Sequence, residues 1–499
     1  MLFSVELLVT GFLVILALIL FLSTASDRRG SKRYPIIGHA LELIRNKDRR
    51  VEWTTELLQA SPSATVAVRL LDRQRILTAD PAAVQHILKT KFDNYPKGED
   101  SRAILFDMLG DGIFNADGAS WKLQRQVSSH EFNTKSLRHF VNHVVDAEVS
   151  DRLIPTLSAA AASGGVLDLQ DILQRFAFDN VCKIAFGYDP EYLLPSLPEA
   201  EFPIAFEDAT VISTYRFISM FPLIWKVKKV LNIGSEKRLK EAVGLIRDFA
   251  KGVVMEKKAE LEKRSALDSV DLLSRFLSSG HSDEEFVRDI VISFILAGRD
   301  TTSAALTWFF WLISEHPEVE GKICQEIGEK SENLMFEDVK NMAYTHAALC
   351  ESMRLYPPVP MDTKIAEDDD VLPDGTKVKK GTRITYHPYA MGRLERIWGP
   401  DWAEFKPERW LKKSEEESDG EKWVFVARDP YSYPVFQAGP RVCLGKEMAF
   451  LQMKRVVAGI LSNFKVVPAV EEGFKPVYVS FMTAKMKGGF PVKFESREK

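Results

Sequence analysis

The sequence is poor in cysteine and has no marked excess of charge of either sign. Its 499 residues include four cysteines, Cys182, Cys324, Cys350 and Cys443, spaced too widely for a disulfide framework or a CxxC metal site. The formal net charge of -4 provides no basic excess, which argues against binding to nucleic acid. This composition fits an ordinary globular protein that faces a reducing, cytosolic environment.

The chain also lacks internal repeats and the glycine fingerprints of flavin or nicotinamide binding. Gly445 and Lys446 are followed by Glu447, whereas a phosphate-binding loop requires Ser or Thr at that place. Any redox chemistry in this protein must therefore take its electrons from a partner.

One long hydrophobic run is present, at the N-terminus. Residues 1–22 contain a single charge, Glu6, and roughly 20 apolar residues at about 1.5 Å each span a hydrocarbon core of about 30 Å. A cleaved signal peptide is the alternative, but no Lys or Arg precedes the run, and four basic residues follow it between 28 and 33. We expect a transmembrane anchor helix at residues 1–25, a basic linker at 26–34 and a cytosolic domain at 35–499.

Helical periodicity dominates the rest of the chain, which predicts a mainly α fold with a small β region. Segments 65–71, 75–78 and 382–386 predict strands because they alternate or are rich in β-branched residues. The small-residue stretch 158–165 predicts a surface loop.

Three predicted helices carry the residues of chemical interest. Ser282 and Glu285 form a capping-box pattern, and apolar periodicity then continues to about Ser314 before His316-Pro317 ends it. The other two helices are predicted at residues 344–355 and 444–461.

A lone cysteine lies in a glycine-rich turn ahead of the last of these helices, where residues 436–445 read FQAGPRVCLG. The amides and positive end of the following helix stabilise a thiolate. Gly439 and Gly445 let a flat cofactor approach the backbone, and Phe436 can screen the sulfur from water. Arg441 can meet a haem propionate. A lone cysteine is ordinarily a buried structural residue, but the whole pattern favours Cys443 as an iron-porphyrin ligand.

This motif resembles the haem-binding signature of the cytochrome P450 superfamily. The resemblance implies the cytochrome P450 fold, a single mainly helical domain with a minor β region. It also implies haem b with Cys443 as the axial iron ligand. Dioxygen is then a substrate, and electrons come from NADPH through a cytochrome P450 reductase.

Residues 297–302, AGRDTT, lie in the middle of the long helix, where glycine and hydroxyl residues ordinarily weaken it. If Thr301 donates to the Ala297 carbonyl, the helix opens locally and leaves a groove for dioxygen and water. The alternative is a packing glycine with solvated polar neighbours. The resemblance implies that Thr301 and Asp300 are catalytic and supply protons for cleavage of the O–O bond.

Glu351 and Arg354 lie one helical turn apart and can form an ion pair. With the PERW segment at 407–410, they resemble the family's ExxR helix and its partner segment. The resemblance implies a Glu351–Arg354–Arg409 network that fixes the loop holding Cys443.

Further cofactor contacts are implied by position. Trp121 and Arg125, also one turn apart, are similar to a pair that the family places against a haem propionate. Lys364 stands where the family commonly has Arg or His after a Pro-Pro segment. Lys446, Lys454 and Arg455 are candidates for a basic face that binds an acidic reductase, against the alternative of ordinary solvated charges.

Segments 94–98, 112–118, 231–236, 372–375 and 386–392 resemble plant fatty-acid omega-hydroxylases. The resemblance implies hydroxylation of a fatty-acid chain end by a protein of the endoplasmic reticulum membrane. Close relatives of that group oxidise jasmonoyl-isoleucine, another carboxylate with an alkyl tail, which stays an alternative substrate. The candidate substrate-lining residues are Phe114, Phe294, Val359 and Phe481, for which ordinary core packing is the alternative.

Two other functions remain open. One is a reductase-independent haem isomerase or dehydratase, against which the Asp300–Thr301 pair argues. The other is a non-catalytic lipid-binding haem protein, which would show a haem spectrum without an NADPH-dependent product.

Overall fold

The computed structural model describes residues 38–70, 73–132, 134–197, 201–219, 221–263, 271–278, 283–328, 334–413 and 423–497. The predicted anchor at 1–25, the linker at 26–34 and the predicted cap Ser282 lie outside these residues. Among the helices that are described, none has the length and apolarity needed to cross a membrane. The chain divides into two compact units: residues up to Pro96 with Met361–Trp402, and Lys97–Pro360 with the residues from Ala403 onward.

A four-stranded sheet of order β1-β2-β7-β4 forms the centre of the first unit. β2 (Arg73–Thr78) pairs antiparallel with β1 (Thr65–Leu70) and parallel with β7 (Arg383–Tyr386). β4 (Asp362–Ile365) pairs antiparallel with β7. The predicted strands are thus present, within two residues of their expected ends.

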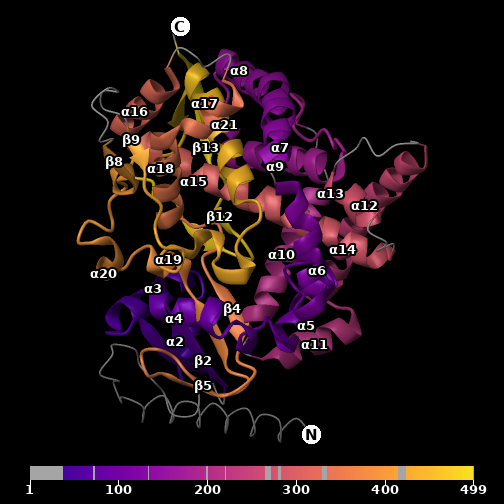
Figure 1. Cartoon of the computed structure of the whole chain (residues 1–499), viewed down its shortest axis with the longest axis vertical. Coiled ribbons are helices and arrows are strands. Elements are labelled where there is room, and N and C mark those ends of the chain that lie inside the picture. The colour runs from indigo at the N-terminus through magenta and orange to yellow at the C-terminus, as the bar shows by residue number, and fades with distance from the viewer. Residues whose placement is uncertain are drawn as a thin grey trace, which may run out of the picture. The chain divides into compact units, whose positions relative to one another are not determined.

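The remaining elements of the first unit are short (Figure 1). They are α2 (Ala40–Arg45), α3 (Arg50–Ala60), α4 (Pro81–Gln85), η1 (His86–Thr90), η2 (Phe92–Asn94), β5 (Asp370–Val371), β6 (Lys377–Val378), α19 (Pro388–Met391) and α20 (Glu395–Trp398).

Helices make up most of the second unit. Up to the long central helix they are α5 (Glu99–Leu109), α6 (Gly118–Ser129), η3 (His130–Phe132), α7 (Thr134–His139), η4 (Phe140–Val145), η5 (Glu148–Leu153), α8 (Ile154–Ser163), α9 (Leu169–Phe186), α10 (Glu201–Ile218), α11 (Pro222–Leu231), α12 (Ser235–Lys263) and α13 (Leu272–Ser278). The later ones are α14 (Glu284–Ile295), η6 (Leu296–Asp300), α15 (Thr301–Glu315), α16 (Pro317–Ile327), α17 (Phe336–Asn341), α18 (Ala343–Leu355), η8 (Pro407–Trp410), η9 (Pro434–Phe436), η10 (Gly439–Arg441) and α21 (Lys446–Asn463).

Three small sheets complete this unit: β10-β13-β3, β11-β12 and β8-β9. Their strands are β3 (Leu167–Asp168), β8 (Leu411–Lys413), β9 (Trp423–Phe425), β10 (Phe464–Pro468), β11 (Tyr478–Ser480), β12 (Ala484–Met486) and β13 (Pro491–Ser496). Because helices outweigh these strands, the predicted mainly α fold with a small β region is confirmed.

Helix α9 lies in the core of the second unit, and its ends follow from local chemistry. Asp168 caps its N-terminus by accepting from the Gln170 amide, and Gly187 ends it with a left-handed φ of 64°. Its apolar residues join a buried cluster with those of α5, α10, α12, α13 and α14. In Figure 1 α9 lies beside α13 and α14, and it also contacts η6 and α15.

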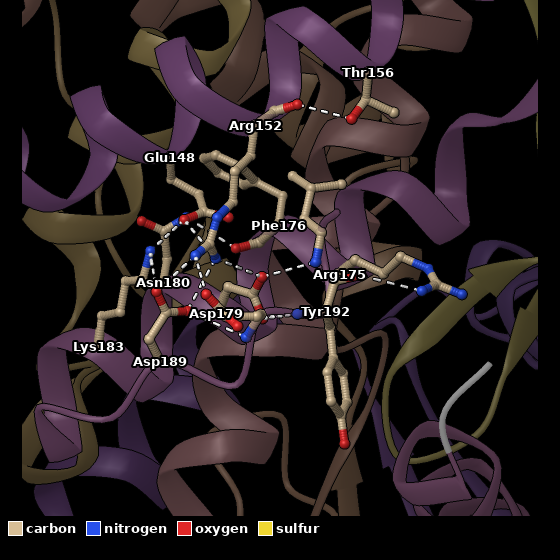
Figure 2. A network of polar contacts seen from close by, with 12 residues as sticks. Glu148, Arg152, Thr156, Arg175, Phe176, Asp179, Asn180, Lys183, Asp189 and Tyr192 are labelled. Carbon is tan, nitrogen blue, oxygen red and sulfur yellow. Dashed lines mark hydrogen bonds and ion pairs between the residues drawn. The ribbon is translucent and has the colours of Figure 1, made fainter. Parts of the chain in front are cut away.

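One face of α9 carries a partly buried polar network (Figure 2). Arg152 donates to the Asp189 carboxylate at 2.9 and 2.7 Å and reaches Asp179 at 3.4 Å. Lys183 donates to Glu148, whose side chain is buried, at 2.6 Å. Burial, above all, raises the pKa of Asp179 to about 7. This network ties η5 and the loop after α9 to the α9 helix.

The long helix expected in this part of the chain consists of α14, η6 and α15, which follow one another without a break. Its N-cap is Asp283, which accepts from the Glu285 amide. His316-Pro317 ends it, as predicted.

The prediction of a surface loop at residues 158–165 is wrong. These residues continue α8 to Ser163, and Gly164, with a φ of 65°, forms the C-cap. The alanine run in this stretch has the highest intrinsic helix propensity, which outweighs the turn preference of its serines.

Candidate active site

The middle of the long helix is widened by one π-helical turn, η6. Thr301 Oγ1 donates to the Ala297 carbonyl oxygen at 2.6 Å, so the hydroxyl occupies an acceptor of the helical backbone. Gly298 lies against α9, since a Cβ at this position would come 2.5 Å from Val181 Cγ2. The segment is therefore both a local opening of the helix and a close helix–helix contact.

An accessible stripe runs along this otherwise buried helix. Between Val287 and Ile313, the residues that are not buried are Phe294, Ala297, Gly298 and Thr301. Their spacing of three, four and seven residues places them on one helix face. A partly exposed stripe inside a buried helix is expected where a ligand fills the space beside it.

Asp300 is buried beside this stripe together with Arg299. Arg299 Nη1 donates to Asp300 Oδ1 at 2.8 Å, and both side chains are almost fully buried. Thr483 Oγ1 donates to Asp300 Oδ2 at 3.4 Å. The polar neighbours of Gly298 are thus buried and paired, which argues against the alternative of a solvated polar surface.

Cys443 lies in a tight loop between η10 and α21. Its amide donates to the Phe436 carbonyl oxygen at 2.8 Å, which closes the loop. Gly439 has a φ of 64°, a left-handed conformation that favours glycine. A Cβ at Gly445 would lie 4.0 Å from Cys443 Sγ. The loop therefore presents the sulfur beside a residue without a side chain.

The Phe436 ring lies 5.1 Å from that of Phe450, centroid to centroid, so α21 packs against the Cys443 loop. In turn, Phe450 stacks at 3.9 Å on His346 of α18. Aromatic packing therefore connects the Cys443 loop to both helices.

Cys443 is the exposed one of the four cysteines, all of which lie within the described residues. Surrounding protein atoms still raise the pKa of its thiol, while the Gly445 amide, Arg125 and Lys446 act in the opposite direction. An exposed cysteine whose thiol has positive groups and an amide donor around it fits a metal-bound thiolate. These residues fit haem, whose iron the Cys443 sulfur would hold.

The predicted propionate-binding residues gather around the same loop. Arg125 Nη1 donates to the Val442 carbonyl oxygen at 2.6 Å. The Arg441 guanidinium lies 4.5 Å from the Trp121 ring centroid and donates to Asp117 at 2.6 Å. Asp117 was not predicted from the sequence. As the residue before Gly118 it also accepts from the Lys97 and Gly98 amides.

Lys364 belongs to the first unit, on β4. Its buried ammonium donates to Asp362 at 2.9 Å, and Asp362 also accepts from the Tyr386 hydroxyl at 2.9 Å. The contact of Lys364 with the cofactor stays a prediction.

Glu351, Arg354 and Arg409 form one buried network. Arg354 donates to both oxygens of Glu351 at 2.8 Å, and Arg409 Nε donates to Oε1 at 3.1 Å. Glu351 also accepts from Trp410 Nε1 at 2.9 Å. The Trp410 ring contacts that of Tyr433, which precedes η9 and the Cys443 loop. Support of the loop by this network stays a prediction.

The four candidate substrate residues are all partly or well exposed, so none belongs to the fully buried core. Their segments are tied to the long helix or to each other. The loop before Phe114 is held to α14 because the Asp111 amide donates to Asp289 at 3.0 Å. Phe481 and Val359 lie on neighbouring segments, since the Ala484 amide donates to the Pro358 carbonyl oxygen at 2.8 Å.

The predicted basic face is wrong for two of its three residues. The Lys454 ammonium is buried and donates to the carbonyl oxygens of Val339 and Lys340 at 3.2 and 2.9 Å. Arg455 is buried and pairs with Asp146. Lys446 is exposed. Lys454 thus binds neutral backbone carbonyl groups and Arg455 a carboxylate, and sequence position alone could not distinguish either from a solvated charge.

Comparison with known proteins agrees with this geometry. Residues 29–494 match the model of the cytochrome P450 family, and the chain belongs to that family. It is 61% identical over 468 residues to cytochrome P450 94A1 of Vicia sativa, which covers 94% of this chain and 90% of that protein. Identity is 63% over 470 residues to cytochrome P450 94A2 of Vicia sativa, covering 93% and 91%. It is 51% over 468 residues to cytochrome P450 94B1 of Arabidopsis thaliana, covering 93% and 91%.

The chain is therefore a cytochrome P450 monooxygenase that uses haem b, with electrons supplied by NADPH through a reductase. Bound haem supplies the redox chemistry that activates dioxygen. The predicted family, enzyme class and cofactor are confirmed.

Proposed function

We propose that this protein hydroxylates the terminal carbon of long-chain fatty acids at the endoplasmic reticulum membrane. The observation that supports it best is the accessible stripe of Phe294, Ala297, Gly298 and Thr301 along a buried helix. Phe114, Val359 and Phe481 lie on segments tied to that helix or to each other. An apolar space of this kind suits an alkyl chain.

In this proposal each residue of the site has one task. The Cys443 sulfur would hold the haem iron, and Arg125, Arg441 and Trp121 would hold a propionate. Thr301 and Asp300 would hold and transfer the protons that the reaction of dioxygen requires. The aromatic rings of Phe114 and Phe481 limit how the chain end approaches.

Hydroxylation of the terminal carbon requires that the site restrict how the substrate chain approaches, because the C–H bonds of the methyl group are stronger than those of the neighbouring methylene. Selectivity must therefore come from which carbon can reach the iron. In this proposal the apolar side chains at positions 114, 294, 359 and 481 supply such a limit.

Membrane association is supported by an exposed apolar helix. No residue of α11 is buried, and Leu223 and Val230 are 72% and 85% exposed. Lys226, Lys228 and Lys229 accompany them, which is typical of helices that lie at an anionic membrane surface. The proposed anchor at residues 1–25 would hold the chain at the same membrane.

The test is turnover in microsomes with a plant reductase and NADPH. A series of fatty acids of increasing length is offered beside jasmonoyl-isoleucine, and mass spectrometry locates the new hydroxyl. Terminal hydroxy fatty acids are the expected products. If jasmonoyl-isoleucine alone is consumed, the substrate is wrong. Oxidation of neither substrate by a haem-loaded protein would favour a lipid-binding role, and a reductase-independent product an isomerase or dehydratase.

A pair of variants tests the role of the proposed channel. Phe114→Ala should move part of the hydroxylation from the methyl carbon to its neighbour, because the chain end gains freedom. Phe106→Ala is the matched control, since Phe106 is a 49% exposed ring on α5 that the proposed channel does not include. Equal product ratios in the two variants would argue against Phe114 as a lining residue.

A further inference from the structure

A proline-rich segment follows α18 and carries Val359. Residues 357–360 read PPVP, so Val359 alone among them has a backbone N–H. Such a segment has few amides with which to bond to its neighbours. Its position therefore depends on groups that donate to its carbonyl oxygens.

Two such donors come from the hairpin of β11 and β12. The Tyr478 hydroxyl donates to the Pro357 carbonyl oxygen at 2.6 Å, and the Ala484 amide donates to that of Pro358 at 2.8 Å. Tyr478 and Ala484 are buried, which strengthens both bonds because little water competes for them. We call this pair of bonds the hairpin contact.

Phe481 lies in the turn between the two donors. Its amide donates to the Thr483 carbonyl oxygen at 3.1 Å, which closes the turn. Phe481 follows Tyr478 by three residues, and Val359 comes directly after Pro358. The hairpin contact therefore joins the segment of one candidate lining residue to that of the other.

The base of the hairpin is also bonded on its second strand. Met486 stands opposite Tyr478 in the register. The Met486 amide donates to Gln170 Oε1 at 2.8 Å, and Gln170 Nε2 donates to the Met486 carbonyl oxygen at 3.1 Å. Gln170 belongs to α9, so the hairpin is bonded to α9 through one strand and to the proline-rich segment through the other.

Two further aromatic rings hold the Tyr478 ring. Its centroid lies 5.6 Å from that of Trp308 and 6.0 Å from that of Tyr356. The rings of Trp308 and Tyr356 stack at 4.0 Å with their planes 6° apart. Trp308 is on α15, seven residues after Thr301 and thus on the same helix face. Tyr478 is therefore packed against the helix that carries the accessible stripe.

We propose that Tyr478 is a positioning residue that selects the carbon to be hydroxylated, by holding Val359 and Phe481 at a fixed separation. The inference rests on the proposed function, in which both side chains line the substrate channel. Because Trp308 and Tyr356 fix the Tyr478 ring, its hydroxyl limits how far the turn can move from the proline-rich segment. A wider separation lets the methylene beside the methyl group react as well.

The first experiment follows the hairpin contact without turnover. Hydrogen exchange of the Ala484 amide is measured by mass spectrometry in the substrate-free haem protein, for the native chain and Tyr478→Phe. The variant keeps the ring and removes the hydroxyl. Exchange should become faster by about twofold to tenfold, the range that one hydrogen bond contributes to an equilibrium. Unchanged exchange would overturn the proposal.

The second experiment measures which carbon of a fatty acid is hydroxylated. Tyr478→Phe should raise the ratio of penultimate to terminal alcohol by about twofold to tenfold, with haem content unchanged. A loss of stability alone lowers both products in proportion and leaves the ratio as it is. A native product ratio beside faster exchange at Ala484 would also overturn the proposal.

Tyr344→Phe is the matched control, because it removes another hydroxyl of a buried tyrosine, the one that donates to Glu408 at 2.9 Å. Its exchange at Ala484 and its product ratio should equal the native values. Equal changes in Tyr344→Phe and Tyr478→Phe would mean a general loosening of the fold and would overturn the proposal.

Gln170→Met is a second variant that leaves Tyr478 intact and removes both bonds to Met486. It should shift the product ratio in the same direction. If Tyr478→Phe fails to retain haem, Gln170→Met decides the question by the same two readouts. If the native protein oxidises no fatty acid, the proposed function fails and the selection of the carbon with it, whereas the exchange at Ala484 still reports whether Tyr478 holds the hairpin.

Discussion

Glu351 shows how much one buried carboxylate can organise. It accepts two bonds from Arg354 and one each from the Lys406 amide, Arg409 and Trp410. Because the side chain is fully buried, these donors replace the water that its charge would otherwise require. The carboxylate thereby joins α18 to the segment that precedes the Cys443 loop.

Glu351→Gln should lower the free energy of unfolding by about 3–5 kcal/mol, because two buried guanidinium groups lose their counter-charge. We expect the haem content per polypeptide to fall together with the melting temperature. Glu318→Gln, at an exposed position on α16, is the control and should change neither. A variant that keeps native haem content and stability would contradict the proposed support of the loop.

Individual residues were predictable from the sequence where their partners are local. The spacing of Glu351 and Arg354 predicts contact within one helical turn, and that of Thr301 and Ala297 a bond to the backbone. Arg299 belongs to the same motif, but its partner Gln174 lies on α9, 125 residues earlier. Sequence position does not reveal such a contact, because it arises from helix packing.

At the scale of elements, the bounds of the helices were predicted better than the groups that their side chains contact. The predicted helix at 344–355 is α18, Ala343–Leu355, and the one at 444–461 is α21, Lys446–Asn463. Lys454 looked like a surface charge on α21. In the fold it lies at the C-terminus of α17, whose carbonyl groups attract a cation.

Burial lowers the pKa of Lys454 to about 8, with Glu326, Cys350 and Glu447 acting weakly in the opposite direction. In the unfolded chain the pKa returns to about 10.4, so the unfolded state binds the extra proton between these values. The native protein should therefore gain stability relative to Lys454→Met as pH rises from about 8 to about 10. The measurement is the difference in melting temperature between the two proteins at each pH, and a constant difference would contradict it.

At the scale of the whole molecule, the first unit combines distant parts of the chain. Strand β2 pairs in parallel with β7, so Thr78 lies opposite Tyr386. Each strand was predictable from its β-branched residues, but the pairing was not, because no local signal connects segments about 300 residues apart. The domain boundaries at residues 1–25, 26–34 and 35–499 stay a prediction.

The whole chain should also touch the membrane through α11. A polarity-sensitive fluorophore on Val230→Cys in the full-length protein should shift to the blue on transfer from detergent to vesicles with anionic lipids. Met255→Cys on α12 is the control, since Met255 is 66% exposed but lies on another helix. Equal spectra at the two positions would argue against contact by α11.

The single π-turn of η6 has a consequence for the whole central helix. It adds one residue to the hydrogen-bonded ladder, so the side chains after Asp300 are rotated by about 100° relative to an uninterrupted helix of 3.6 residues per turn. The two halves can therefore present different faces to their neighbours while sharing one axis. In evolutionary terms η6 acts as a one-residue insertion absorbed within a helix, and deleting a residue there would misalign the contacts of α15.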